Sequence, residues 1–216
     1  MTDKTIENWT ARLQRIAAAE LGDDGSHDLY HFKRVFALAS AIADKEGAKV
    51  DRLVLLAAAY LHDIVNPPKD SPLRIKASTL SAERAGDILK QEDFPADKIA
   101  AVQHAIAAHS YSAGILPDTP EAKILQDADR MEALGAIGLA RTFYVGGRLK
   151  SSLFEPEDPF AAHRELNDAK YAVDHFHAKL FKLPALMNTA EGRRIAEARA
   201  EFLQNFLDQL QSELKT

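Results

Sequence analysis

The chain has 216 residues, of which 46% are apolar and 27% are charged. This composition suffices to bury a sizeable core, and it excludes disordered and collagen-like proteins. The formal net charge of −5 provides no overall attraction to nucleic acid or to an anionic membrane, so we expect neither as a partner.

The chain contains no cysteine, which excludes disulfides, thiolate zinc sites and cysteine nucleophiles. Any metal site must therefore use nitrogen and oxygen ligands. The first residues lack the apolar core of a signal peptide, and no stretch approaches the roughly 20 apolar residues of a membrane span. A cytoplasmic location without membrane contact is expected.

Apolar residues recur at steps of three and four along most of the chain, which predicts amphipathic helices. The expected helices cover residues 5–21, 28–46, 51–63, 78–91, 95–109, 119–132, 139–145, 161–183 and 189–214. Ser26 or Asp28 can cap the second helix, and Ser78 or Ser81 the fourth. No alternation of period two appears at any length, so the predicted fold class is all-α.

A single domain over residues 1–216 accounts for this pattern. We expect its core at about residues 26–135, with C-terminal helices at 161–214 packed on it.

An adjacent histidine and aspartate, His62 and Asp63, end the third predicted helix, which begins DRLVLLAAAY. An imidazole and a carboxylate at the end of a buried helix are costly to desolvate unless something binds them. A divalent metal is one explanation. The alternative is a helix that simply ends in two polar residues before a proline-containing loop.

Other candidate ligands lie on neighbouring predicted helices: His31, His104, His109 and Asp129. Taken singly, His31 fits an ordinary core or surface histidine, and Asp129 fits a solvated acid paired with Arg130. Imidazole and carboxylate from several elements are, however, the ligands that a metal without thiolates usually takes.

Together, His31, the His62–Asp63 pair and Asp129 follow the order H…HD…D, which resembles the bacterial HD-domain metal-dependent phosphohydrolases. The stretches that resemble this family extend over nearly the whole chain and comprise residues 26–35, 60–64, 108–112, 126–138, 168–171, 174–176 and 182–184. The resemblance implies a helical HD-domain bundle.

The resemblance also implies that His31, His62, Asp63 and Asp129 hold one divalent metal. Mn²⁺ is the expected ion, with Mg²⁺, Ni²⁺, Co²⁺, Zn²⁺ and Fe²⁺ as alternatives. Such a ligand set leaves positions open for a water and a substrate phosphate. Extra histidines hold a second metal in some relatives, but His104 and His109 are five residues apart, a poor spacing for one helix face.

Catalytic roles are expected for Asp63 and His109, since His109 could donate a proton to the leaving oxygen or orient the substrate. Candidate substrate contacts are Arg34, Lys69, Lys76, His27 and Arg148. Arg34 could instead pair with Asp28 or Asp63, and Lys69 could be a solvated loop lysine. Arg148 could close over a triphosphate or simply mark a helix end.

The implied function is hydrolysis of a small-molecule nucleotide, first of all cleavage of a deoxynucleoside triphosphate to the monophosphate and pyrophosphate. One alternative is a nucleoside 5′-monophosphatase. A non-catalytic nucleotide-sensing module and a structural helical protein with a fortuitous cluster are the others. Sequence alone leaves the physiological metal and the oligomeric state open, a homodimer included.

Overall fold

The computed structural model describes residues 3–20, 29–47, 49–67 and 71–215. The chain forms two compact units, Met1–Asp129 and Arg130–Thr216. Over the described residues the regular structure is helical, apart from one isolated parallel bridge between Ser152 and Tyr171. The all-α prediction is confirmed, whereas the expected domain limits stay a prediction.

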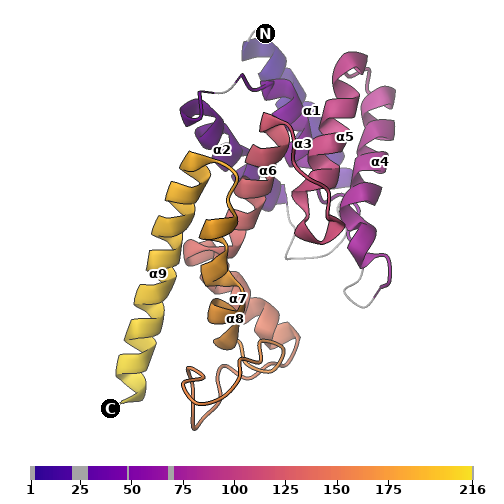
Figure 1. The fold of residues 1–216 in the computed structure, drawn as a ribbon. Coiled ribbons are helices and arrows are strands. Elements are labelled where there is room, and N and C mark those ends of the chain that lie inside the picture. Colours follow the sequence, from indigo (N-terminus) through magenta and orange to yellow (C-terminus); the bar gives the residue numbers. More distant parts are fainter. Residues whose placement is uncertain (1–2, 21–28, 48, 68–70, 216) are drawn as a thin grey trace. The chain divides into compact units, whose positions relative to one another are not determined.

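The first unit is built from helices (Figure 1). They are α1 (Asp3–Glu20), α2 (Leu29–Lys45), α3 (Arg52–Leu61), α4 (Ala77–Gln91), α5 (Ala96–His109) and α6 (Pro120–Arg130), whose last residue already belongs to the second unit. Two single 3₁₀ turns, η1 (Arg74–Lys76) and η2 (Tyr111–Ala113), lie in the connections.

Helix α3 is the centre of this unit, since every residue from Leu53 to Leu61 is buried. It packs against α1, α2, α4 and α5. Its start is fixed by Asp51, whose carboxylate accepts hydrogen bonds from the backbone N–H groups of Leu53 and Val54 and also pairs with Lys98. Each fully buried leucine contributes about 1.5–3 kcal/mol, so α3 forms a firm base for the residues that follow it.

Helix α3 ends at Leu61, two residues earlier than predicted, and His62 is its C-terminal cap. The His62 ring explains this end, because its Nδ1 lies 2.9 Å from the carbonyl oxygen of Ala59. The last carbonyls of a helix have no partner within the helix. The side chain of His62 therefore satisfies one of them, and Asp63 lies in the turn that follows.

Helix α4 begins at Ala77 with Lys76 in the capping position and no side-chain cap. The prediction that Ser78 or Ser81 caps it is therefore wrong. Both serines lie inside the helix and are buried, with relative exposures of 1% and 0%. The predicted capping residues of α2, Ser26 and Asp28, lie outside the described residues.

The second unit is organised on the long C-terminal helix. Its elements are η3 (Met131–Ala133), α7 (Gly135–Arg148), α8 (Asp174–Ala178), η4 (Leu180–Lys182), η5 (Pro184–Leu186) and α9 (Ala190–Leu214). Helix α7 packs on α9, and its Phe143 meets Phe176 and Phe206 in an aromatic cluster.

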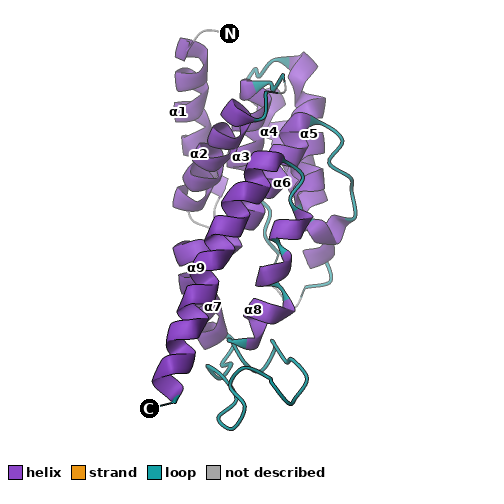
Figure 2. Cartoon of the chain, turned by 60° about the vertical axis from the view of Figure 1, so that its left-hand side comes forward, coloured by secondary structure: helices purple, strands orange, loops and turns teal. Residues whose placement is uncertain are grey.

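The predicted helix at 161–183 is wrong, because a loop occupies most of this range and only α8 and η4 are helical (Figure 2). Local hydrogen bonds replace the helical ones. The Asp158 carboxylate accepts from the N–H groups of Ala162 and His163, and Ala161 has a positive φ of 52°. Short acidic side chains compete with helix formation in this way.

Helix α7 runs through Gly146 and Gly147 to Arg148, beyond the predicted end at residue 145. The reason lies in packing, since Gly146 is buried and a Cβ there would lie 3.3 Å from the Cβ of Ala172. A glycine at this point lets the loop that follows α7 return close to the helix.

None of the helices in the described part of the chain combines the length and the hydropathy of a membrane span. The expected cytoplasmic location stays a prediction.

Candidate metal centre

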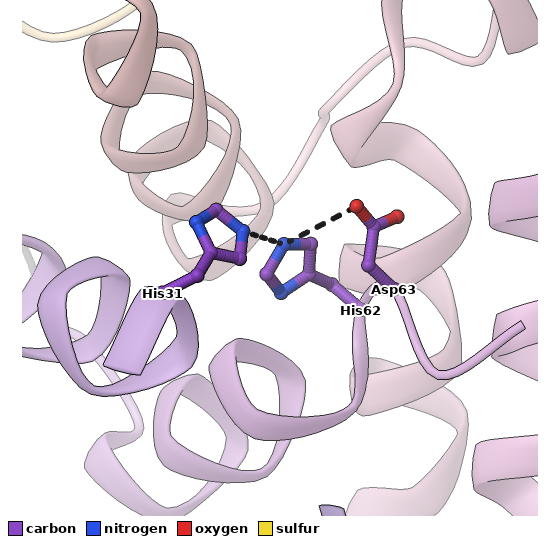
Figure 3. Close-up of side chains that lie close together, drawn as sticks. All are labelled: His31, His62 and Asp63. Carbon is purple, nitrogen blue, oxygen red and sulfur yellow. Dashed lines mark hydrogen bonds and ion pairs between the residues drawn. The ribbon is translucent and has the colours of Figure 1, made fainter. Parts of the chain in front are cut away.

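Four of the predicted ligands converge within the first unit, although they come from three separate parts of the chain. His31 lies in the first turn of α2, His62 and Asp63 directly follow α3, and Asp129 is next to last in α6. The imidazoles of His31 and His62 are 1% and 0% exposed, and they point toward each other, with Asp63 beside them (Figure 3).

Three of these side chains form a nearly equilateral triangle of potential ligand atoms. The His31 Nε2 and His62 Nε2 atoms are 3.2 Å apart, and Asp129 Oδ1 lies 3.5 Å from the first and 3.6 Å from the second. The centre of a triangle with these sides lies about 2 Å from each corner, close to the usual length of a bond from Zn²⁺ to histidine nitrogen or carboxylate oxygen.

The protonation of His62 prepares it to act as a ligand. Its Nδ1 donates to the Ala59 carbonyl oxygen, which can only accept. In a neutral ring this leaves the lone pair of Nε2 directed at His31. Two nitrogen lone pairs 3.2 Å apart would repel, so a proton or a cation has to lie between these rings.

The two carboxylate oxygens of Asp63 approach different histidines. Its Oδ2 lies 4.0 Å from His62 Nε2, while its Oδ1 lies 3.4 Å from His109 Nε2. His109 comes from the last residue of α5 and is 5% exposed, and its Nδ1 lies 2.6 Å from the carbonyl oxygen of Ile106. Asp63 thus joins the cluster to a further buried histidine.

The charges of this cluster shift two pKa values strongly. Burial alone would lower the pKa of His109, but its hydrogen bond with Asp63 and the negative charges of Asp63 and Asp129 raise it to about 9. Burial alone would raise the pKa of Asp129, but interaction with His62 and the charges of His109 and His31 hold it well below its usual range. Each shift favours the charged form of the side chain.

The donor set fits a divalent metal. Two overlapping groups have ligand atoms within 4.8 Å of one another, one of His31, His62 and Asp63, and the other of His62, His109 and Asp129. Nitrogen and oxygen donors of this kind suit Mn²⁺, Zn²⁺, Fe²⁺ and related ions. The cluster could therefore hold a metal ion.

Other predicted site residues lie in surroundings of their own. His104, which we considered for a second metal, pairs instead with Asp118, with 2.5 Å between Nε2 and Oδ1. Lys76 is exposed at the end of η1. Arg148 belongs to the second unit, where its guanidinium lies 5.9 Å from the centre of the Tyr144 ring.

Arg34 lies in α2 and is half-buried, three residues after His31. The remaining two candidates for substrate contact, His27 and Lys69, lie outside the described residues.

Two contacts around the site were not predicted from the sequence. The first is the approach of His109 to Asp63. The second is a pair of hydrogen bonds just after the His62–Asp63 pair, in which the Ser81 hydroxyl accepts from the Val65 N–H and donates to the Val65 carbonyl oxygen. The spacing of Ser78 and Ser81 by three, within an otherwise apolar helix face, is a signal that could have indicated buried hydroxyls.

Comparison with known proteins gives consistent relatives. The family model described as the HD domain matches residues 28–134. YpgQ, an uncharacterised protein of Bacillus subtilis (strain 168), is 32% identical over 199 residues, which cover 90% of this chain and 88% of that protein.

Solved structures extend this similarity to nearly the full chain. The crystal structure of Bacillus subtilis YpgQ in complex with ADP is 29% identical with a TM-score of 0.75, and the match covers 97% of this chain and 96% of that one. An HD-superfamily hydrolase from Bacillus thuringiensis is also 29% identical, with a TM-score of 0.74 and coverage of 98% and 99%.

Proposed function

Because the chain belongs to the HD-domain family and is a metal-dependent phosphohydrolase, we propose that it hydrolyses deoxynucleoside triphosphates to monophosphates and pyrophosphate. A nucleotide as substrate is supported by the similarity to YpgQ, whose crystal structure contains ADP. That similarity is the observation that carries the substrate class.

In this proposal His31, His62, Asp63 and Asp129 hold one divalent ion, with Mn²⁺ as the first candidate. When bound, the ion would polarise a phosphoryl oxygen and lower the pKa of a water. The buried imidazoles fix the site, since the His62 ring is oriented by the Ala59 carbonyl. Asp63 contributes charge and also orients His109.

His109 acts as the proton donor. Hydrolysis at the α-phosphorus forms a bond to the water oxygen and breaks the bond to the bridging oxygen, which leaves with the pyrophosphate. That leaving oxygen gains negative charge and is stabilised by a proton. A buried imidazole that lies 3.4 Å from the Asp63 carboxylate is placed to carry this proton and to supply it.

Arg34 and Lys76 are the proposed phosphate contacts among the described residues, because a triphosphate needs positive charge around the site. Arg34 lies one helical turn from His31 on α2. Contacts by His27, Lys69 and Arg148 stay predictions.

Product analysis in ¹⁸O-labelled water tests the proposal. The protein is incubated with the four deoxynucleoside triphosphates and Mn²⁺, and the products are separated by ion-exchange chromatography and weighed by mass spectrometry. We expect monophosphate and pyrophosphate, with the label in the monophosphate, and no release by Asp63→Ala. Label in the pyrophosphate contradicts the proposal. A protein that leaves the triphosphates intact and releases orthophosphate and nucleoside only from a monophosphate also contradicts it.

A further inference from the structure

The buried hydroxyl of Ser81 forms hydrogen bonds with the backbone just after the His62–Asp63 pair. Ser81 Oγ, in α4, lies 3.1 Å from the backbone nitrogen of Val65 and 3.2 Å from its carbonyl oxygen. A serine hydroxyl can accept from the N–H and donate to the C=O at once. Ser81 itself is 0% exposed.

These hydrogen bonds lie in a loop, outside regular secondary structure. Helix α3 ends at Leu61, and the next helical turn, η1, begins at Arg74. Among the described residues, no hydrogen bond between main-chain groups holds Val65. The hydroxyl of Ser81 therefore provides the hydrogen bonds that secondary structure does not provide for the Val65 backbone.

Asp63 lies only two residues before the held peptide. Two residues of extended chain span at most about 7 Å, so fixing Val65 restricts where the Asp63 backbone can lie. Ile64, between them, is 7% exposed and is held by the core. The backbone that carries the Asp63 carboxylate is thus fixed before it by α3 and after it by Ser81.

A second hold lies further along the same loop. The Arg74 guanidinium donates to the side-chain oxygen of Asn66 and, over 3.2 Å, to the carbonyl oxygen of Pro67. Residues 65–67 are thus fixed by side chains from α4 and η1.

We infer that Ser81 is a positioning residue for the metal centre, which acts by fixing the Val65 peptide and through it the Asp63 carboxylate. This inference rests on the proposed metal site but not on the identity of the substrate. Groups that orient metal ligands typically change metal affinity about 10–100-fold when they are removed.

The chain offers a matched control one turn earlier in α4. Ser78 is 1% exposed, and its hydroxyl has no hydrogen-bond partner in the described part of the structure. Ser78→Ala and Ser81→Ala remove the same atom from the same helix at the same burial. They differ in the two bonds to Val65.

The test measures Mn²⁺ binding to the metal-free full chain by isothermal titration calorimetry, without nucleotide. We expect Ser81→Ala to weaken Mn²⁺ binding by at least about tenfold and Ser78→Ala to change it less than about twofold. A purely structural serine would lower the Tm of the metal-free protein and leave the Mn²⁺ affinity unchanged.

Equal Mn²⁺ affinity of the wild type and Ser81→Ala overturns the inference, even if the wild type releases pyrophosphate. Conversely, Mn²⁺ binding that Ser81→Ala weakens supports it, even if no nucleotide is hydrolysed and the proposed function fails. If Ser81→Ala does not fold, Ser81→Cys keeps the shape with a weaker hydrogen-bonding group. Weakened Mn²⁺ binding by that variant supports the inference, and unchanged binding overturns it.

Discussion

The Nε2 atoms of His31 and His62 face each other across 3.2 Å in the buried interior of the first unit. His62 donates its other ring proton to the Ala59 carbonyl, so its Nε2 presents a lone pair at this point. Asp129 Oδ1 lies at a similar distance from both nitrogens. Two imidazoles and a carboxylate arranged in this way are suited to share one cation.

The first prediction concerns the histidine at the centre of the cluster. His62→Ala should lose stoichiometric Mn²⁺, because it removes the ring that contacts His31, Asp63 and Asp129. Elemental analysis after dialysis measures the metal, and far-UV circular dichroism checks the helical content.

His104→Ala is the matched control, since His104 pairs with Asp118 outside the cluster. It should retain the metal of the wild type. Full metal content in His62→Ala would show that this histidine is not a ligand.

The second prediction separates a proton donor from a ligand. His109→Gln should lower kcat by about 10²–10⁴-fold, the usual contribution of general acid–base catalysis. Mn²⁺ affinity should change much less, because in this account His109 acts through its proton and its contact with Asp63. Calorimetry and steady-state kinetics measure both. Loss of Mn²⁺ binding as in His62→Ala would instead make His109 a ligand.

The third prediction concerns close packing at the start of α7. A Cβ at Gly138 would lie 2.2 Å from the backbone carbonyl of Ala133, so Gly138→Ala should cost about 1–3 kcal/mol or more in unfolding free energy. At Gly147, in the same helix, a Cβ meets nothing within 4 Å. Gly147→Ala should therefore be neutral or stabilise by up to about 1 kcal/mol. Urea unfolding curves that rank the two variants the other way would contradict this packing.

The fourth prediction is a pH dependence in the second unit. Burial alone would raise the pKa of Asp174, but hydrogen bonds from Arg164 and from the Asn167 N–H lower it. A carboxylate with a lowered pKa stabilises the fold fully above its unfolded value of about 3.9, and this stabilisation is lost as the pH falls further. Asp174→Asn should therefore lower the unfolding free energy at about pH 6, by about 1–3 kcal/mol for the loss of hydrogen bonds to a charged group.

The difference between wild type and Asp174→Asn should shrink as the pH falls below about 4, because protonated aspartate resembles asparagine. Urea unfolding of both proteins, down to the lowest pH at which each still folds, measures it. A difference that stays constant with pH would mean that the Asp174 charge is not the source of the stability.

Much of the fold could be predicted because its helices carry clear apolar periodicity and polar or proline boundaries. Helix α3 is the clearest case, because it carries an uninterrupted apolar run. The segment at 161–183 could not be predicted in this way. Its apolar residues suit a helix. Its conformation is instead set by contacts between residues that are not neighbours in sequence, such as the bridge between Ser152 and Tyr171 and the ion pair between Arg164 and Asp174.

The site shows the same division. The order of His31, His62, Asp63 and Asp129 along the chain was enough to propose the ligand set, because the family that it resembles brings these four positions together at one metal. The contact between His109 and Asp63 depends on the end of α5 packing beside the turn after α3, which no local pattern records. The role inferred for Ser81 likewise depends on a loop that local propensity does not specify.

Anomalous diffraction from crystals soaked in Mn²⁺ tests the central claim most directly. We expect a peak about 2 Å from His31 Nε2, His62 Nε2 and Asp129 Oδ1, with the Asp63 carboxylate as a further ligand. Absence of a peak at this position, or a Mn²⁺ ion bound elsewhere with these four side chains free of metal, would contradict it.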